Sequence, residues 1–550
     1  MSSMMHRPLL ISSLIEHAAQ NHGTTEIISR TIEGGEAFTL HRSDYRTACK
    51  RARQLANALS RLDVKKGDRI GTLAWNGYRH FEIYYGVSGM GAVMHTINPR
   101  LFPEQLAYIA NHADDQYIFF DLTFVPLIAA LAINAPGIKG FVAMTDRASL
   151  AKAVGASTIR NLLCYEDLIA AESDQYQWPQ FDELTPSSLC YTSGTTGNPK
   201  GVLYTHRSTI LHTMVGMSPE ALNISAQEVL LPVVPMFHVN AWGLPYMCTA
   251  AGAKLVFPGA AMDGASLHSL FEQEKVTVSA GVPTVWLGLL AHVKSNRLKF
   301  STLKETIIGG SACPPAMIES FERDYAVRVV HAWGMTEMSP IGTVCRLMAK
   351  HLALAPAEQF QLQIKQGRVV YGVEMKIVDG DGKSLPRDGK AFGDVMVRGP
   401  CIIERYFKEQ HSALIDGWFP TGDVGTIDAD GYLQITDRSK DVIKSGGEWI
   451  SSIDLENIAM AHPAVTEAAV IGIAHPKWDE RPLLVVVKKQ GAVVTAAELL
   501  KFYEGKIAKW WTPDDVVFVD QLPHTATGKL LKTKMREDFK AYKLPTVAPD

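Results

Sequence analysis

The sequence predicts an α/β protein: a large N-terminal domain of parallel-rich sheets flanked by helices, and a small mobile α+β domain at the C-terminus. Two observations predict this class. Short apolar runs alternate with helix-length segments over most of the 550 residues, and the pattern becomes a compact mixture of strands and helices after residue 437. A chain of this length is expected to form two or more domains.

Each strand of the large domain is predicted from a short apolar run. The runs are 70–75, 117–121, 229–234, 253–257, 276–281 and 306–310. A segment long enough for a helix follows every run, for example 80–90 after the first and 124–133 after the second. Buried runs that alternate with helices are typical of largely parallel sheets.

The C-terminal domain follows a turn-rich segment with Asp-Gly pairs at 416–417 and 430–431. The elements predicted beyond it are a helix at 452–460, strands at 467–473 and 483–489, a helix at 496–509 and a strand at 516–520. We therefore expect one domain at 1–436 and a second at 437–550, whose size is usual for an independent domain. The hinge between them is placed at Asp437–Arg438.

The composition excludes several classes of protein. A formal net charge of -3 offers no basic surface to a nucleic acid. Seven scattered cysteines form neither a disulfide framework nor a zinc motif, and they indicate a reducing, cytoplasmic compartment. The most apolar segment, 124–133, is far shorter than the roughly 20 residues of a membrane span. No transmembrane segment is expected, and peripheral contact with a membrane is left open.

The stretch YTSGTTGNPKG (191–201) gathers hydroxyl groups, glycines and a lysine. The spacing of a P-loop, G-x-x-x-x-G-K-[ST], does not fit it, because Pro199 stands where the second glycine is required and Gly201 follows Lys200. The stretch can still surround a polyphosphate with hydrogen-bond donors, and the apolar run before it is predicted to be a strand. Taken alone, it is explained equally well as a surface turn between two strands.

Four later segments point to the same chemistry. In HAWGMTEMSP (331–340), Trp333 can cover an adenine ring, Thr336 can bond a phosphate and Glu337 can hold Mg²⁺. The others are TGD (421–423), with an acid for ribose hydroxyls, a charged segment with a glycine pair (437–451), and PHTATGKLLK (523–532), with a lysine in a turn. Each has a plainer explanation by itself, such as a solvated carboxylate, a turn or a surface lysine.

Together and in this order, these segments resemble the adenylate-forming acyl-CoA synthetases, a family of AMP-binding enzymes, over nearly the whole chain. The pattern looks most like the bacterial medium-chain fatty acyl-CoA ligases. One departure is Trp333, where many members have a tyrosine, although an aromatic ring is retained. The resemblance implies a ligase that forms an acyl-adenylate from ATP, releases pyrophosphate and passes the acyl group to coenzyme A (CoA).

The resemblance also implies roles for individual residues. Lys529, Glu337 and His238 are expected to be catalytic, and Thr192 and Glu337 are expected to hold Mg²⁺. The face that meets the active site for the CoA step is expected at Lys444, Gly446, Gly447 and Glu448. The residues expected to contact the nucleotide are Thr192, Ser193, Gly194, Thr195, Thr196, Gly197, Lys200, Val239, Trp242, Gly310, Ser311, His331, Ala332, Trp333, Gly334, Met335, Thr336, Asp423, Arg438, Lys440, Lys444 and Trp449.

An apolar pocket is expected for the acid. The resemblance places His238 and Trp242 beside the acyl chain, and the two would share a face if this stretch is helical. A second wall, at Gly281, Val282 and Pro283, has no Lys or Arg to receive a second carboxylate. We therefore expect a monocarboxylic acid with a hydrocarbon tail, first of all a medium-chain fatty acid.

Other readings stay open at this point. The substrate can be 3-methylmercaptopropionate or another short- or long-chain acid, and the acceptor can be a carrier protein instead of CoA. A non-catalytic protein that binds acyl groups or nucleotides is a further alternative, although it would have no need of Lys529. The expected partners are a small carboxylic acid, ATP, CoA and, by analogy with relatives, a second copy of the chain in a homodimer.

Overall fold

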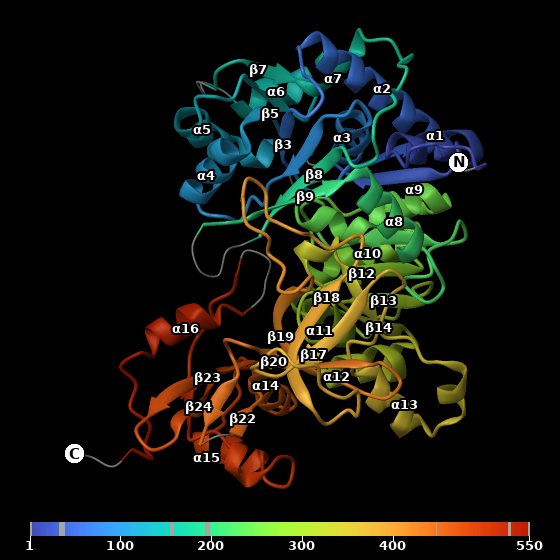
Figure 1. Ribbon diagram of the computed structural model, residues 1–550. Helices are drawn as coiled ribbons and strands as arrows, with labels where there is room; N and C mark the ends of the chain where they lie inside the picture. Colours follow the sequence, from blue (N-terminus) through green and yellow to red (C-terminus); the bar gives the residue numbers. More distant parts are fainter. Residues whose placement is uncertain are drawn as a thin grey trace.

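The computed structural model describes residues 3–31, 33, 39–154, 159–192, 198–446, 448–525 and 530–547, without the side chains of residues 448 and 449. Two large, mostly parallel sheets with their helices are followed by a smaller C-terminal part, drawn in red in Figure 1. The predicted α/β class with a smaller C-terminal α+β part is therefore confirmed. No helix among these residues is long and apolar enough to cross a membrane.

The first sheet has seven strands in the order β7-β6-β5-β3-β4-β8-β9. Their bounds are β3 (Arg69–Leu73), β4 (Val93–Thr96), β5 (Asp115–Phe120), β6 (Gly140–Ala143), β7 (Leu162–Cys164), β8 (Pro186–Tyr191) and β9 (Gly201–Thr205). Neighbouring strands are parallel except for β9, which runs antiparallel to β8. The chain therefore reverses direction within the YTSGTTGNPKG stretch, which connects these two strands.

The second sheet has nine strands in the order β16-β15-β14-β13-β12-β10-β11-β1-β2. Their bounds are β1 (Glu26–Arg30), β2 (Leu40–Asp44), β10 (Val229–Pro232), β11 (Lys254–Phe257), β12 (Val278–Gly281), β13 (Glu305–Ile308), β14 (Arg328–Gly334), β15 (Ile341–Val344) and β16 (Arg368–Val369). The strands from β14 to β1 are mutually parallel. Their carboxyl ends consequently share one edge of the sheet, the edge at which open α/β sheets bind ligands.

Helices fill the space between the two sheets and cover their outer faces. Their bounds are α1 (Ser12–Asn21), α2 (Tyr45–Arg61), α3 (Tyr78–Gly89), α4 (Pro103–Ala113), α5 (Val125–Asn134), α6 (Arg147–Val154), α7 (Tyr165–Ala170), α8 (His206–Gly216), α9 (Leu244–Ala251), α10 (Gly264–Glu274), α11 (Pro283–Ser295), α12 (Pro315–Glu319) and α13 (Pro356–Gln363). One apolar core joins both sheets through α2, α3 and α9. Two further cores pack α4 and α5 on the first sheet and α10 to α12 on the second.

The starts of several helices are fixed by side-chain caps. The Asp44 and Asp263 carboxylates and the Thr205 hydroxyl each accept a hydrogen bond from the backbone N–H three residues further on, at the first turns of α2, α10 and α8. Each cap satisfies a backbone donor that the helix leaves without a partner. These caps set where α2, α8 and α10 begin; Asp44 and Thr205 are also the last residues of β2 and β9, so these two strands lead directly into their helices.

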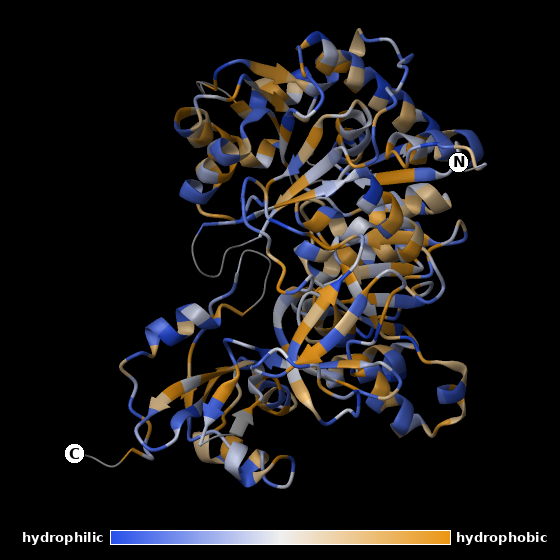
Figure 2. Cartoon of the chain, in the orientation of Figure 1, coloured by the Kyte–Doolittle hydropathy of each residue, from blue (hydrophilic) through white to orange (hydrophobic). Residues whose placement is uncertain are grey.

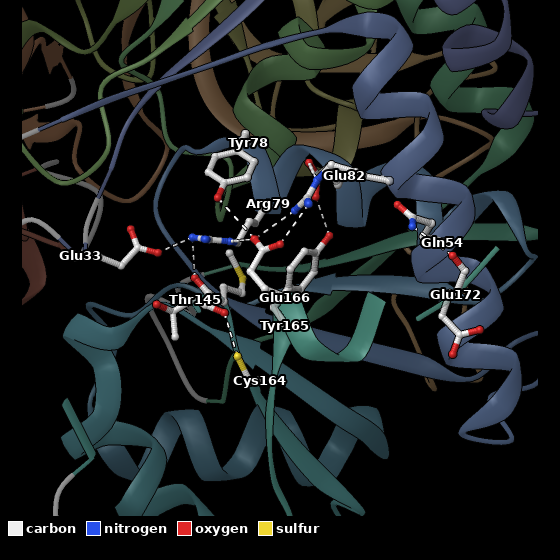
Figure 3. A network of polar contacts seen from close by, with 12 residues as sticks. Glu33, Gln54, Tyr78, Arg79, Glu82, Thr145, Cys164, Tyr165, Glu166 and Glu172 are labelled. Atoms are coloured by element: carbon white, nitrogen blue, oxygen red, sulfur yellow. Dashed lines mark hydrogen bonds and ion pairs between the residues drawn. The ribbon is translucent and has the colours of Figure 1, made fainter. Parts of the chain in front are cut away.

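A charged network joins α2, α3 and α7 (Figure 3). Arg51 Nε donates to Glu82 Oε1 at 2.7 Å, and its terminal nitrogens donate to both oxygens of Glu166. Arg79 Nε also donates to Glu166, and the Tyr165 hydroxyl donates to Glu82, each at 2.7 Å. Burial raises the pKa of Glu82, and Arg51 opposes this shift. Removing one partner of such a buried pair would leave an uncompensated charge.

A four-stranded antiparallel sheet comes next, and its strands are β17 (Glu374–Val378), β18 (Phe392–Arg398), β19 (Phe419–Ile427) and β20 (Leu433–Arg438). The predicted Asp-Gly turns lie in two of the three connections of this sheet, before β19 and before β20. Asp416, Gly417 and Gly431 have positive φ, which is the backbone conformation that favours Gly and Asp in tight turns.

The C-terminal part has the strands β21 (Ile443–Ser445), β22 (Glu448–Ile450), β23 (Val465–His475), β24 (Asp479–Lys488) and β25 (Asp515–Phe518) and the helices α14 (Ser452–Met460), α15 (Ala496–Phe502) and α16 (Lys532–Asp538). One apolar cluster packs α14 and α15 on one face of this sheet, and another packs α16 on the opposite face. Most of α16 is hydrophilic (Figure 2). All the predicted elements are present, but the helix expected at 496–509 ends at Phe502.

Candidate active site

A cavity of about 360 Å³ lies where the loops that follow β4, β8, β10, β11, β12, β13 and β14 meet. The described residues that line it are Arg100, Thr192, Asn198, Lys200, Val233, Val234, Pro235, His238, Val239, Trp242, Met262, Val282, Val285, Gly309, Gly310, Ala332, Trp333, Gly334, Met335, Thr336, Glu337, Pro340, Ile341, Tyr406 and Arg438. Most of the predicted site residues whose side chains are described belong to this set. The cavity therefore brings together segments that are far apart in the sequence.

Thr192 and Lys200, at the two ends of the predicted phosphate-binding stretch, both line the cavity. The Thr192 N–H donates to the Lys200 carbonyl at 2.9 Å, which closes the stretch at its base. A P-loop leads from a strand into a helix, whereas this stretch leads from β8 into the antiparallel strand β9. Between these ends, Ser193, Gly194, Thr195, Thr196 and Gly197 lie outside the described residues.

Trp333, near the end of β14, is hydrogen-bonded to the acid of the TGD segment. Its indole Nε1–H donates to Asp423 Oδ2 at 2.9 Å, and Arg438 Nε lies 2.8 Å from Oδ1 of the same carboxylate. Asp423 is buried and does not line the cavity itself, but Trp333 and Arg438 do. Trp333, which is predicted to cover adenine, is thus connected to Asp423, the acid predicted to bind ribose. Arg438, at the predicted hinge, is connected to the same carboxylate.

Glu337 follows β14 in the short turn η4 (Thr336–Met338), and it is buried at the cavity wall. Together with Thr192 it supplies a carboxylate and a hydroxyl, the oxygen donors that Mg²⁺ prefers. Mg²⁺ is commonly held by one or two protein carboxylates and by the phosphates of a nucleotide, so this pair fits the ion. Within the described residues there is no group of three or more His, Cys, Asp or Glu that could hold a metal without a nucleotide.

Positive charge predominates in the described lining of the cavity. Arg100, Lys200 and Arg438 line it, against the single carboxylate of Glu337. Burial lowers the pKa of Arg100, but a guanidinium starts from so high a value that it stays charged. Cations beside oxygen donors suit a polyphosphate ligand.

The loops after β10, β11 and β12 add an apolar wall. It consists of Val233, Val234, Pro235, Trp242, Met262, Val282 and Val285. Trp242 packs against the backbone at Gly309, where an added Cβ would lie 3.2 Å from the indole ring. Burial against such a wall stabilises a bound hydrocarbon chain.

The stretch after His238 is not the right-handed helix on which the predicted shared face with Trp242 depended. It forms a left-handed turn, η2 (Val239–Gly243), in which four consecutive non-glycine residues have φ between 48° and 58°. This conformation costs L-residues about 1–2 kcal/mol each. The Asn240 amide donates to Ser188 Oγ of β8 at 2.9 Å and so anchors the turn. His238 and Trp242 nevertheless both line the cavity.

Several predicted residues lie beside the lining without belonging to it. His331 is buried: its Nδ1 lies 3.2 Å from the Ile364 carbonyl, and its Nε2 accepts from the Cys313 N–H at 3.4 Å. Burial lowers the pKa of His331 to about 4, so the ring is neutral near pH 7. Gly281, Pro283 and Ser311 are sequence neighbours of the lining residues Val282 and Gly310 but do not line the cavity.

The predicted hinge lies at the end of β20. The buried Asp437 carboxylate accepts a hydrogen bond from the backbone N–H of Ser452, the first residue of α14, at 2.7 Å. Lys440 and Lys444 are exposed, and the Gly446 N–H donates to the Trp478 carbonyl at 3.0 Å. Lys440, Lys444 and Gly446 are not part of the cavity lining.

The remaining predicted residues fall outside what the structure describes. Lys529 and Gly447 are not among the described residues. Glu448 and Trp449 belong to β22, but their side chains are not described. Their roles stay predictions.

The lining residues that were not predicted from the sequence include Arg100, Met262 and Tyr406. Arg100 follows β4 and Met262 follows β11. Loops at the carboxyl ends of parallel strands commonly form the site, so that rule could have found both. Tyr406 comes from the long connection between β18 and β19, which carries no sequence signal for this role.

Comparison with known proteins agrees with this geometry. The family described as AMP-binding enzyme matches residues 15–407, and the AMP-binding enzyme C-terminal domain matches residues 454–529. The chain therefore belongs to the AMP-binding enzyme family, and the predicted resemblance is confirmed. The predicted boundary between 436 and 437 falls between the two matched ranges and stays a prediction.

Within this family the chain is an acyl-CoA ligase, as its full-length relatives are. It is 55% identical over 541 residues to 3-methylmercaptopropionyl-CoA ligase from Ruegeria lacuscaerulensis, which covers 98% of this chain and 99% of that protein. It is 51% identical to a medium-chain fatty acid–CoA ligase from Ectopseudomonas oleovorans, over 98% of this chain and 97% of that protein. The crystal structure of an anthranilate CoA ligase with anthranoyl-AMP matches with a TM-score of 0.84 at 26% identity, over 97% of this chain and 98% of that one.

Proposed function

We propose that this ligase uses ATP to activate an apolar monocarboxylic acid, with a medium-chain fatty acid as its preferred substrate, and then forms the CoA thioester. The observation that carries the proposal is the make-up of the cavity. Cations and oxygen donors stand in the same cavity as an apolar wall, and the described residues of that wall include no Lys or Arg. Such a cavity suits a nucleotide joined to a hydrocarbon acid.

In the first half-reaction, a carboxylate oxygen of the acid bonds to the α-phosphorus of ATP, and the bond from that phosphorus to pyrophosphate breaks. Thr192 and Lys200 would receive the phosphates of the leaving group. Thr192 and Glu337 would hold Mg²⁺, whose charge would offset that of the phosphates. Lys529 would bring a further positive charge to the α-phosphate. Positioning and charge neutralisation supply most of the rate in such phosphoryl chemistry.

The nucleoside would be held on the Trp333 side of the cavity. The indole ring would cover adenine, and Asp423 would accept hydrogen bonds from the ribose hydroxyls while Trp333 and Arg438 hold its carboxylate. This arrangement leaves the α-phosphate facing the loops of Thr192 and Glu337. His238 would lie beside the reacting carbonyl and the start of the acyl chain.

In the second half-reaction, the sulfur of the CoA thiolate bonds to the carbonyl carbon of the adenylate, and the carbon–oxygen bond to AMP breaks. AMP thus leaves with one oxygen of the original carboxylate. We place the hinge at Asp437–Arg438, between domains at 1–436 and 437–550. Rotation about it would bring Lys444, Gly446, Gly447 and Glu448 to the site, and hinges at loop positions are common in such closures.

The apolar wall supports the proposal of a medium-chain tail. Each buried methylene contributes about 0.8 kcal/mol, so a medium-length tail gains several times this amount from the wall while the charged end keeps its place. A second candidate is 3-methylmercaptopropionate, because the relative at 55% identity bears that name while the medium-chain relative is 51% identical. Other short- or long-chain acids, and a carrier protein as the acyl acceptor, are outcomes of the same test.

The experiment is CoA-dependent AMP formation from ATP and Mg²⁺ across straight-chain acids from acetate to palmitate, with 3-methylmercaptopropionate in the same series. The proposal predicts the highest kcat/KM at a medium-chain acid such as octanoate. Malonate and succinate are matched controls with a second carboxylate, and they should be poor substrates. A maximum at 3-methylmercaptopropionate would show that this acid, and not a medium-chain fatty acid, is the preferred substrate. Formation of the adenylate without the thioester would show that CoA is not the acyl acceptor.

A further inference from the structure

Tyr406 contacts both the predicted phosphate-binding stretch and the predicted metal carboxylate. It lies in the connection between β18 and β19 and lines the cavity, and its hydroxyl donates to Glu337 Oε1 at 2.8 Å. Lys200 Nζ lies 4.9 Å from the centre of the tyrosine ring, which is within range of a cation–π interaction. One side chain therefore joins the cation at the end of the stretch to the carboxylate opposite it.

The backbone on either side of Tyr406 is held in place. The Ile403 N–H donates to the Glu337 carbonyl at 3.0 Å, and the Phe407 N–H donates to the Gly201 carbonyl at 2.8 Å. Ile403 and Tyr406 also pack on a small buried cluster of Cys190, Val202 and Tyr204 from β8 and β9. Because these contacts fix the backbone and the ring, the hydroxyl has a defined position from which it can orient a carboxylate.

We propose that Tyr406 is a positioning residue whose hydroxyl fixes the orientation of the Glu337 carboxylate for the Mg²⁺ of bound ATP. The inference rests on the proposed function and deepens its metal site. Groups that hydrogen-bond to a metal ligand orient it, and their loss typically lowers metal affinity or activity by 10- to 100-fold. The ring of Tyr406 contacts Lys200, and only its hydroxyl contacts the Glu337 carboxylate. A phenylalanine at this position would therefore keep the first contact and remove the second.

The test is Tyr406→Phe in the full-length protein, with ATP binding measured by isothermal titration calorimetry in excess Mg²⁺ and again in EDTA. We expect the affinity for ATP in Mg²⁺ to fall by roughly 10-fold, while the affinity in EDTA stays unchanged. The Mg²⁺ concentration for half-maximal ATP–pyrophosphate exchange should rise by a similar factor. Thioester formation from a preformed acyl-adenylate should be unaffected, because that step does not use the bound triphosphate.

Tyr204→Phe is the matched control. It removes a buried hydroxyl that donates to the Thr336 carbonyl at 2.6 Å, next to Glu337 in the chain but not on its carboxylate. The ratio of the two affinities should not change in this variant. In a Glu337→Gln background, Tyr406→Phe should have little further effect on the affinity for ATP, because the effects of substitutions at residues that act through one another do not add.

Three results would overturn the inference. Tyr406→Phe could leave the affinity in Mg²⁺ unchanged, could lower the affinities in Mg²⁺ and in EDTA equally, or could add its full effect to that of Glu337→Gln. The first two would give the hydroxyl no role or a purely structural one. If Mg²⁺ did not raise the affinity of the wild-type protein for ATP, the proposed metal site would be wrong. This result distinguishes a failure of the proposed function from a failure of the inference on Tyr406 alone.

Discussion

Replacing Trp333 by phenylalanine removes one hydrogen bond and keeps an aromatic ring in the cavity. The lost bond runs from the indole Nε1–H to Asp423 Oδ2 at 2.9 Å, while Arg438 holds Oδ1 at 2.8 Å. A hydrogen bond to a charged group contributes about 1.5–3 kcal/mol. Because Arg438 still holds one oxygen in the variant, we expect the lower end of this range. A loss of about 1.5 kcal/mol corresponds to a roughly 10-fold higher KM for ATP.

The assay is ATP–pyrophosphate exchange at a saturating concentration of the acid, with ATP varied. The kcat of Trp333→Phe should change little, because the lost bond orients Asp423, the residue proposed to bind ribose, and not the reacting groups. Trp178→Phe is the matched control, since it removes an indole N–H bond to the Glu16 carboxylate, at 2.6 Å, outside the cavity. An unchanged KM for ATP in Trp333→Phe, or an equal rise in Trp178→Phe, would refute the reasoning.

The remaining predictions concern Lys529, the acyl wall and two buried groups. Lys529→Ala should slow adenylation by about 10²-fold or more while thioester formation from a preformed adenylate changes far less. Equal losses in the two half-reactions would contradict its role. Trp242→Ala should shift the chain-length profile of kcat/KM and leave the KM for ATP unchanged. An unchanged profile would show that Trp242 only packs in the protein core and does not contact the acyl chain. Arg51→Met removes the only cation of the described network that is bonded to the buried Glu82, at 2.7 Å, and leaves the Tyr165 hydroxyl as its partner, so it should lower the free energy of unfolding by about 3–5 kcal/mol, as measured by urea denaturation. A loss no larger than that of an exposed pair, at most about 1 kcal/mol, would show that the network is not needed for stability. Burial raises the pKa of Asp121 from 3.8 to about 7, so the folded state holds this proton more tightly and stability is lost as the pH rises from 4 to 7. Asp121→Asn should therefore gain in unfolding free energy relative to the wild type over that interval, and a constant difference would contradict the shift.

Much of the fold could be predicted because its signals are local. The parallel strands are short apolar runs buried on both faces, such as β3 and β13, and runs of that kind stand out in a sequence. The helix α14 has the predicted bounds, Ser452–Met460, because Ser451 caps its first turn by accepting from the Asp454 N–H at 3.1 Å. The helix α15 is shorter than expected, and Gly505, at φ 74°, is a stop signal that could have been used.

The parts of the site that could not be predicted depend on contacts between distant residues. The left-handed turn before Gly243 is anchored by the bond from Asn240 to Ser188, 52 positions earlier, and its own residues show no preference for positive φ apart from Asn240. Tyr406 reaches Glu337 across 69 positions. Thr192, Trp333 and Glu337, which line the cavity, could be proposed from the sequence because each belongs to a short signature that can be read without such contacts.

The measurement that tests the central claim most directly follows the oxygen atoms of the acid. The protein is incubated with ATP, Mg²⁺, CoA and an acid labelled with oxygen-18 in its carboxylate, and AMP and pyrophosphate are examined by mass spectrometry. If the carboxylate attacks the α-phosphorus, each AMP carries one labelled oxygen and pyrophosphate carries none. Unlabelled AMP, or label in pyrophosphate or inorganic phosphate, would contradict the acyl-adenylate.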